Sequence, residues 1–125
     1  MKKQQWLLGA GLLAFLALMV GAALLYREEN SDILALLEQC KEDIPEKQTP
    51  ELLINSVMEV RNKGLVFNLR KNRWNIAAGS IPLHDHERRV VAALTLMGNM
   101  EDFAGNKLPL LESAMRKAAV QCEAN

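Results

Sequence analysis

The feature that most restricts the fold of this chain is an uninterrupted apolar run from Trp6 to Tyr26. The run contains no charged residue and no proline. A helix of about 20 such residues crosses the hydrocarbon core of a bilayer. Lys2 and Lys3 precede the run, and an excess of positive charge marks the cytoplasmic side of a span. The sequence therefore predicts a transmembrane signal-anchor helix within residues 1–26.

A cleaved signal peptide is the alternative to a retained anchor. Small residues suited to a cleavage site occur as Val20 with Ala22, and as Gly21 with Ala23. Both alternatives export residues 27–125 across the membrane. The predicted location is therefore the bacterial inner membrane, crossed once, with a cytoplasmic N-terminus and a periplasmic C-terminal domain.

The composition of the exported part favours helices. Its length suits a single domain. Half of the residues are hydrophobic but only 5% are aromatic, so the core must consist of Leu, Ala, Val, Ile and Met. Such side chains favour packing between helices. The formal net charge is zero, which gives no general argument for nucleic acid as a partner.

Helical periodicity predicts about four helices after the anchor. Ser31 is a suitable N-cap for the first, and Pro45 ends it. Thr49 caps the second, and Gly64 is a natural stop. The predicted helices span about 31–43, 49–64, 83–97 and 108–122, with a short helical turn around Phe103 between the last two.

Residues 65–78 show the alternation of a β-hairpin instead of a helical period. If Lys71 and Asn72 form the turn, Phe67 lies opposite Ile76 and the apolar residues share one face. An irregular loop or a broken helix is the alternative. The predicted fold class is therefore mostly α: one transmembrane helix, then a small helical domain with one possible hairpin at 65–78.

Cys40 and Cys122 are the only cysteines, and each lies near the end of a predicted helix. An exported domain with an even cysteine count is usually oxidised. We therefore predict a Cys40–Cys122 disulfide, which would stabilise the fold by roughly 4 kcal/mol in the chain-entropy model. Two buried free thiols are the alternative.

Charges are segregated along the exported part. Residues 28–59 are mainly acidic, whereas residues 61–89 are mainly basic. The basic segment suits an acidic partner or anionic headgroups near the anchor, and a solvated surface is the alternative. Exposed Arg and Trp at a loop tip are typical of binding hot spots. The predicted partner-binding residues are Arg70, Lys71, Arg73 and Trp74.

One dense group of potential metal ligands lies at residues 84–87. Histidine and methionine together suit Cu(I). The alternative is a helix start whose acidic residues favour the helix dipole, with solvated histidines. The candidate copper ligands are His84, His86, Met97 and Met100.

No nucleophile elbow, phosphate loop or dinucleotide fingerprint is present in the sequence. We therefore predict a non-enzymatic accessory or regulatory protein of a bacterial envelope complex that needs no cofactor. Its partners would be a protein in or near the membrane and the bilayer itself, through residues 6–26, but no nucleic acid. A periplasmic copper-binding protein is the alternative function, and a cell-wall hydrolase is a third.

Overall fold

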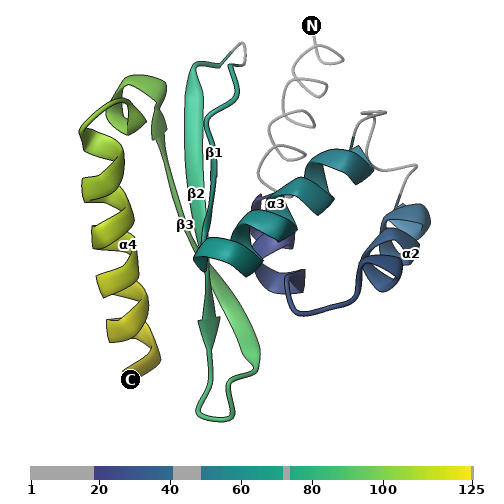
Figure 1. Ribbon diagram of the computed structural model, residues 1–125. Helices are drawn as coiled ribbons and strands as arrows, with labels where there is room; N and C mark the ends of the chain where they lie inside the picture. The colour runs from purple at the N-terminus through teal and green to yellow at the C-terminus, as the bar shows by residue number, and fades with distance from the viewer. Residues whose placement is uncertain (1–18, 41–48, 72–73, 125) are drawn as a thin grey trace, which may run out of the picture.

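The computed structural model describes residues 19–40, 49–71 and 74–124. They form an α/β fold around a three-stranded antiparallel sheet of order β1-β2-β3. Helix α4 lies on one side of the sheet, and α2 and α3 lie on the other (Figure 1). Along the chain the elements are α2 (Asn30–Cys40), α3 (Thr49–Lys63), β1 (Val66–Asn68), β2 (Ile76–His84), β3 (Val90–Asn99), the 3-10 helix η1 (Met100–Phe103) and α4 (Lys107–Ala124).

The predicted fold class is wrong, and the largest error concerns the third helix, at 83–97. This segment forms the end of β2, a turn and most of β3. Val90, Val91 and Leu94 recur at a spacing that fits a helix, but in a strand β-branched residues pack equally well. Residues 90–99 form a strand and not a helix because they pair with β2 along nearly their whole length.

Pro82 lies within β2 although proline cannot donate a ladder hydrogen bond. Strand β1 pairs with β2 only as far as Ser80, which lies opposite Val66. Beyond that point β2 has β3 as its one neighbour in the sheet, with Pro82 opposite Ala93. The proline therefore lies where the strand needs hydrogen bonds on one edge only.

The predicted hairpin at 65–78 has two neighbouring strands, but its register is wrong. Phe67 lies opposite Gly79, not opposite Ile76. The connection between β1 and β2 is accordingly much longer than a two-residue turn. Gly79 suits this position because the Phe67 ring lies directly over it: a Cβ on Gly79 would come within 2.6 Å of Phe67 Cε1.

The helices that begin at recognisable caps are confirmed. Helix α3 begins at Thr49, and Gly64 ends it with a φ of +86° and an N–H that donates to the Val60 carbonyl. Helix α4 and the turn around Phe103 also lie close to their predicted positions. Helix α2 is described as far as Cys40, and the remainder of the predicted helix, at 41–43, lies outside the described residues.

The described part of the apolar run, residues 19–26, packs into the core of the domain. Residues 19–25 are helical, and Met19, Ala22 and Ala23 are fully buried. Met19 and Ala22 pack in one cluster with side chains of α2, α3 and the sheet, among them Ile33 and Val57. Complete burial of a side chain such as Ile33 stabilises a fold by roughly 1.5–3 kcal/mol.

The transmembrane prediction is therefore wrong for residues 19–26, because a buried core helix and a membrane span have the same apolar composition. Within residues 19–40, 49–71 and 74–124, every helix is too short or too polar to span a bilayer. Residues 1–18, which hold the first part of the run, lie outside the described residues.

A second cluster lies on the opposite face of the sheet. Met115 and Ala119 of α4 pack there against Leu65 and Ile81. Strand β2 is thus covered on both faces, and its residues are buried without a break from Ala77 to Pro82, which explains why so few of them are polar.

Candidate functional site

A groove runs beside β1 between the end of α3 and the start of α4. We call it the β1 groove. Its volume of about 380 Å³ is within the usual range for small-molecule sites. The lining residues are Glu59, Lys63, Leu65, Phe67, Leu69, Arg70, Leu108 and Glu112. A smaller hollow of about 220 Å³ shares Glu59, Phe67, Leu69 and Arg70 with it and extends along α3.

The short strand β1 provides the apolar floor of the groove. Its alternation directs Leu65, Phe67 and Leu69 to the same side of the sheet as α4. The Phe67 ring is held edge-on to Phe103 of η1, with centroids 6.2 Å apart. The Phe67 N–H donates to Glu59 Oε2 at 2.8 Å, so α3 satisfies an amide on the open edge of β1.

The carboxylates of the groove are already engaged. Glu59 accepts the Phe67 amide, and Glu112 accepts from Arg116 at 2.9 Å. Arg116 also donates to the Lys63 carbonyl at 2.6 Å, which ties α4 to the end of α3.

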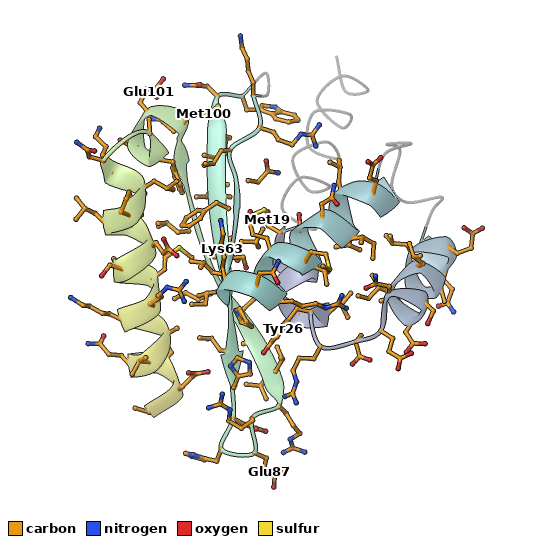
Figure 2. All side chains as sticks on the ribbon, in the orientation of Figure 1. Met19, Tyr26, Lys63, Glu87, Met100 and Glu101 are labelled. Atoms are coloured by element: carbon orange, nitrogen blue, oxygen red, sulfur yellow. The ribbon has the colours of Figure 1, made fainter. Side chains whose placement is uncertain are left out.

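Lys63 supplies a positive charge at the side of the groove. Figure 2 shows it at the end of α3 next to the sheet. Among the residues that the structure describes, no carboxylate forms an ion pair with the Lys63 ammonium. Arg70, in the connection after β1, is a second, exposed cation that lines the groove. The groove therefore combines an apolar floor with positive charge.

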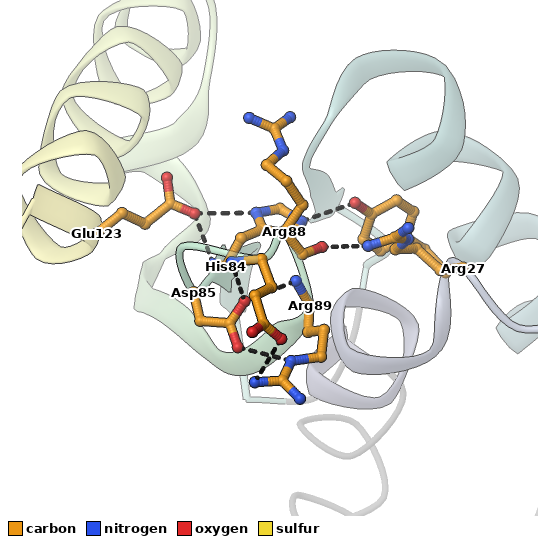
Figure 3. A network of polar contacts seen from close by, with 8 residues as sticks. Arg27, His84, Asp85, Arg88, Arg89 and Glu123 are labelled. Carbon is orange, nitrogen blue, oxygen red and sulfur yellow. Dashed lines mark hydrogen bonds and ion pairs between the residues drawn. The ribbon is translucent and has the colours of Figure 1, made fainter.

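A separate polar network joins three elements at the end of β2 (Figure 3). The Tyr26 hydroxyl and His84 Nε2 are 2.7 Å apart, and Glu123 Oε2 of α4 lies 2.9 Å from His84 Nδ1. Glu123 also accepts the His84 backbone N–H at 2.5 Å. Burial opposes ionisation of Glu123, but hydrogen bonds from His84 and the charges of His84 and Arg88 outweigh it and lower the pKa of the carboxyl group.

The β2–β3 turn is organised by Asp85. Its Oδ1 accepts the backbone N–H groups of Glu87 and Arg89, and its Oδ2 accepts from the Arg89 side chain. Hydrogen bonding from the Arg89 amide is the main reason why the pKa of Asp85 is lowered. Arg88 adopts a φ of +67° in this turn, and its carbonyl accepts from Arg27. The acidic residues thus form a turn, and the prediction that they start a helix is wrong.

The candidate copper ligands do not converge. His84 is held by Tyr26 and Glu123 at the end of β2, whereas Met97 lies opposite Ala78, about 20 Å further along the sheet. Among the described residues there is no group of three or more His, Cys, Asp or Glu side chains that could hold a metal ion.

The predicted partner-binding residues lie at the connection between β1 and β2. Arg70 and Lys71 are exposed, and Trp74 is half-buried. Arg73 lies outside the described residues. Arg70 also lines the β1 groove, but a role of these residues in binding a protein stays a prediction.

The predicted Cys40–Cys122 disulfide also stays a prediction. Cys122 is exposed near the end of α4. The side chain of Cys40 lies outside the described residues.

Sequence reasoning missed the remaining residues of the β1 groove, such as Lys63, Glu112 and Leu108. They come from two helices far apart in the chain and follow no linear motif. The one local signal is the helix end at Lys63–Gly64, which places a cation beside the strand that follows.

Comparison with known proteins identifies the family of this fold. The model of the bacterial transcriptional regulator IclR C-terminal family matches residues 15–124. No curated protein matches the chain in sequence. Several solved structures share its fold, at identities too low to show more than the fold.

The C-terminal domain of Escherichia coli KdgR has a TM-score of 0.65 and 19% identity, over 85% of this chain and 66% of that one. The repressor BlcR of Agobacterium tumefaciens has a TM-score of 0.68 and 14% identity, over 85% and 44%. An IclR regulator of Alicyclobacillus acidocaldarius has a TM-score of 0.66 and 21% identity, over 83% and 42%. The chain thus spans between 42% and 66% of the length of these three structures.

These matches overturn the predicted function. The predictions of an envelope accessory protein, a periplasmic copper protein and a cell-wall hydrolase are wrong, because the match is to transcriptional regulators. The predicted periplasmic domain, inner-membrane location and bilayer contact through residues 6–26 are wrong too, because a span of that length needs residues 19–26, and these pack into the domain. The exclusion of nucleic acid is wrong for a family whose members regulate transcription.

The family match begins within the apolar run and ends at the close of α4, so it includes the β1 groove and the His84 network. The described fold agrees with it, since the solved regulators superpose on most of the chain. This chain belongs to the IclR family of bacterial transcriptional regulators, as a form of its C-terminal domain.

Proposed function

We propose that this chain is the ligand-sensing part of a transcriptional regulator and that it binds a small carboxylate in the β1 groove. The role is regulatory and not enzymatic. The observation that carries the proposal is the pairing of an apolar floor with the Lys63 ammonium, which no described carboxylate neutralises.

The chemistry of the groove suits an amphipathic anion. A ligand tail would cover Leu65, Phe67 and Leu108, and burial of apolar surface is favourable by about 25 cal/mol per Å². A carboxylate would accept from Lys63 or Arg70, and such charge-assisted hydrogen bonds are stronger than neutral ones. A cationic ligand would meet carboxylates that already have donors.

Ligand binding in this groove would affect three elements at once. The groove is bounded by α3, β1 and α4, and Arg116 already joins α4 to the end of α3. A ligand that binds more tightly to one arrangement of α3, β1 and α4 increases the fraction of molecules in that arrangement. In a complete regulator, this shift would be passed to a DNA-binding unit, so DNA is a proposed partner of the whole protein.

Calorimetric titration of the full chain with hexanoate and with 1-hexanol tests the proposal. We expect hexanoate to bind, with 1-hexanol at least tenfold weaker because it lacks the charge. Lys63→Met should weaken hexanoate binding by about tenfold. Lys117→Met, on the exposed side of α4, is the matched control and should bind as the wild type does. Equal binding of the acid and the alcohol, or equal binding by both variants, would contradict the proposal.

A further inference from the structure

A side chain, and not a strand, closes the open edge of β1. On one side β1 pairs with β2, and no other strand of the described residues pairs with its second side. Glu59 of α3 satisfies this edge, since its Oε2 accepts the Phe67 N–H at 2.8 Å. The contact is partly buried, and both residues line the β1 groove. The Glu59 carboxylate therefore occupies a backbone donor at the proposed ligand site.

The peptide N–H of Phe67 points away from β2. Residues of an antiparallel pair alternate between hydrogen-bonded and non-hydrogen-bonded positions, and side chains come closer at the latter. Because the Phe67 N–H donates to Glu59, its pair with Gly79 is of the non-hydrogen-bonded kind. The close approach of the Phe67 ring to Gly79 agrees with this. The donor thus lies on the groove side of β1, where a ligand can reach it.

Glu59 binds this amide although a cation lies one helical turn away. Glu59 and Lys63 are four residues apart on α3, in the order that favours an ion pair. The part of the chain that the structure describes has no such pair. The groove therefore has two donors for a carboxylate: the Lys63 ammonium and the Phe67 N–H, which Glu59 already occupies.

We propose that Glu59 is an internal competitor for the ligand of the β1 groove, and that a bound carboxylate displaces it from the Phe67 N–H. The inference rests on the proposed function, since it needs an anionic ligand in this groove. Two carboxylates repel each other, so both do not bind one amide. The ligand would accept from Phe67 and Lys63 together, as Glu59 does not.

The smaller hollow provides a second position for the displaced side chain. Glu59 lines this hollow as well as the β1 groove, together with Asn55 and Ser56 from the preceding turn of α3. The amide of Asn55 and the hydroxyl of Ser56 are hydrogen-bond donors that suit a carboxylate. Displacement would also remove the hydrogen bond that joins α3 to the edge of β1, so ligand binding would alter the attachment of this helix.

Calorimetric titration of the full chain with hexanoate tests the proposal. Glu59→Ala should bind hexanoate about tenfold tighter than the wild type, because the charged competitor for the donor is gone. Glu59→Gln can still accept the Phe67 N–H but has no charge, so its affinity should lie between the two. Glu112→Gln is the matched control: it removes a charge from the same groove without opening a donor on β1, and its gain should be clearly smaller than that of Glu59→Gln.

Nuclear magnetic resonance of the wild type follows the displacement itself. The Glu59 side-chain carboxyl carbon and the Phe67 amide should shift together as hexanoate is added. A saturated wild type with an unchanged Glu59 signal would overturn the proposal, and so would equal gains from Glu59→Gln and Glu112→Gln.

The two proposals fail in different ways. If hexanoate binds the wild type through Lys63 but no tighter to either Glu59 variant, Glu59 is not a competitor and the proposed function stands. If hexanoate binds neither the wild type nor the Glu59 variants, both proposals are overturned. Glu59→Gln keeps an acceptor for the amide, so the test does not depend on the folding of Glu59→Ala.

Discussion

Gly79 shows how closely single residues determine the packing of this sheet. It lies in the centre of β2, with the Phe67 ring above it and Met115 of α4 nearby. A glycine in a strand weakens it through backbone entropy, so its presence here is explained by the close approach of the ring. The same ring forms the floor of the β1 groove.

Replacement of Gly79 by alanine should destabilise the fold by about 1–3 kcal/mol, because the new Cβ would overlap the Phe67 ring. Urea unfolding followed by circular dichroism measures the loss. Gly21→Ala is the matched control, since its Cβ would meet Leu53 Cδ1 at an ordinary 3.8 Å, and this variant should be as stable as the wild type or slightly more so. Equal loss in both variants would contradict the packing described.

Glu123 makes the stability depend on pH. Its folded-state pKa is lowered, so its ionised form stabilises the fold above the unfolded pKa of about 4.3. The contribution is lost as the pH falls through the folded pKa. The wild type should therefore melt higher than Glu123→Gln at pH 7, and the difference should shrink below about pH 4. Exposed Glu29→Gln is the control. A constant difference from pH 7 to pH 3 would exclude this role for Glu123.

At the scale of elements, Arg61 of α3 holds the connection between the helix at 19–25 and α2. Its guanidinium donates to the Tyr26 carbonyl at 2.8 Å, to the Glu28 carbonyl at 2.6 Å and to Asn30 Oδ1 at 2.8 Å. Lysine lacks the planar set of donors that reaches three acceptors. The orientation of α2 thus depends on a residue of the next helix.

Arg61→Ala should lower the melting temperature by several degrees, since an exposed hydrogen-bonding group of this kind contributes about 1 kcal/mol. Arg61→Lys should recover little of it. Thermal unfolding by circular dichroism compares both with Lys117→Ala, which changes an exposed residue of α4. Full recovery by lysine would show that charge alone holds the connection.

The elements differ in how far they are predictable from sequence. Helix α3 has its cap at Thr49 and its stop at Gly64, and both signals are local. The sheet depends on pairing between segments far apart, as with Val66 and Ser80, and no local signal reports that register. Asp85, read as a first-turn acid, instead binds the amides of a hairpin turn.

The candidate site is predictable only in part, because its residues come from segments that lie far apart in the sequence. Arg70 is recognisable as an exposed cation, but its neighbours Lys63 and Leu108 come from the ends of two other elements. The apolar run misled the prediction because the physical chemistry of a core helix resembles that of a span. Only its contacts with Ile33 and Val57 distinguish the two.

At the scale of the whole molecule, residues 19–26 pack against an IclR-type domain, with Met19, Ala22 and Ala23 fully buried. Amide hydrogen exchange of the full chain in aqueous buffer without detergent tests this directly. We expect the amides around Ala22 and Ala23 to be protected to the same degree as those of Ala77 and Ala78, and to lose protection in the same unfolding transition. Fast exchange at 19–25 beside a protected sheet, or protection that appears only in detergent, would contradict it.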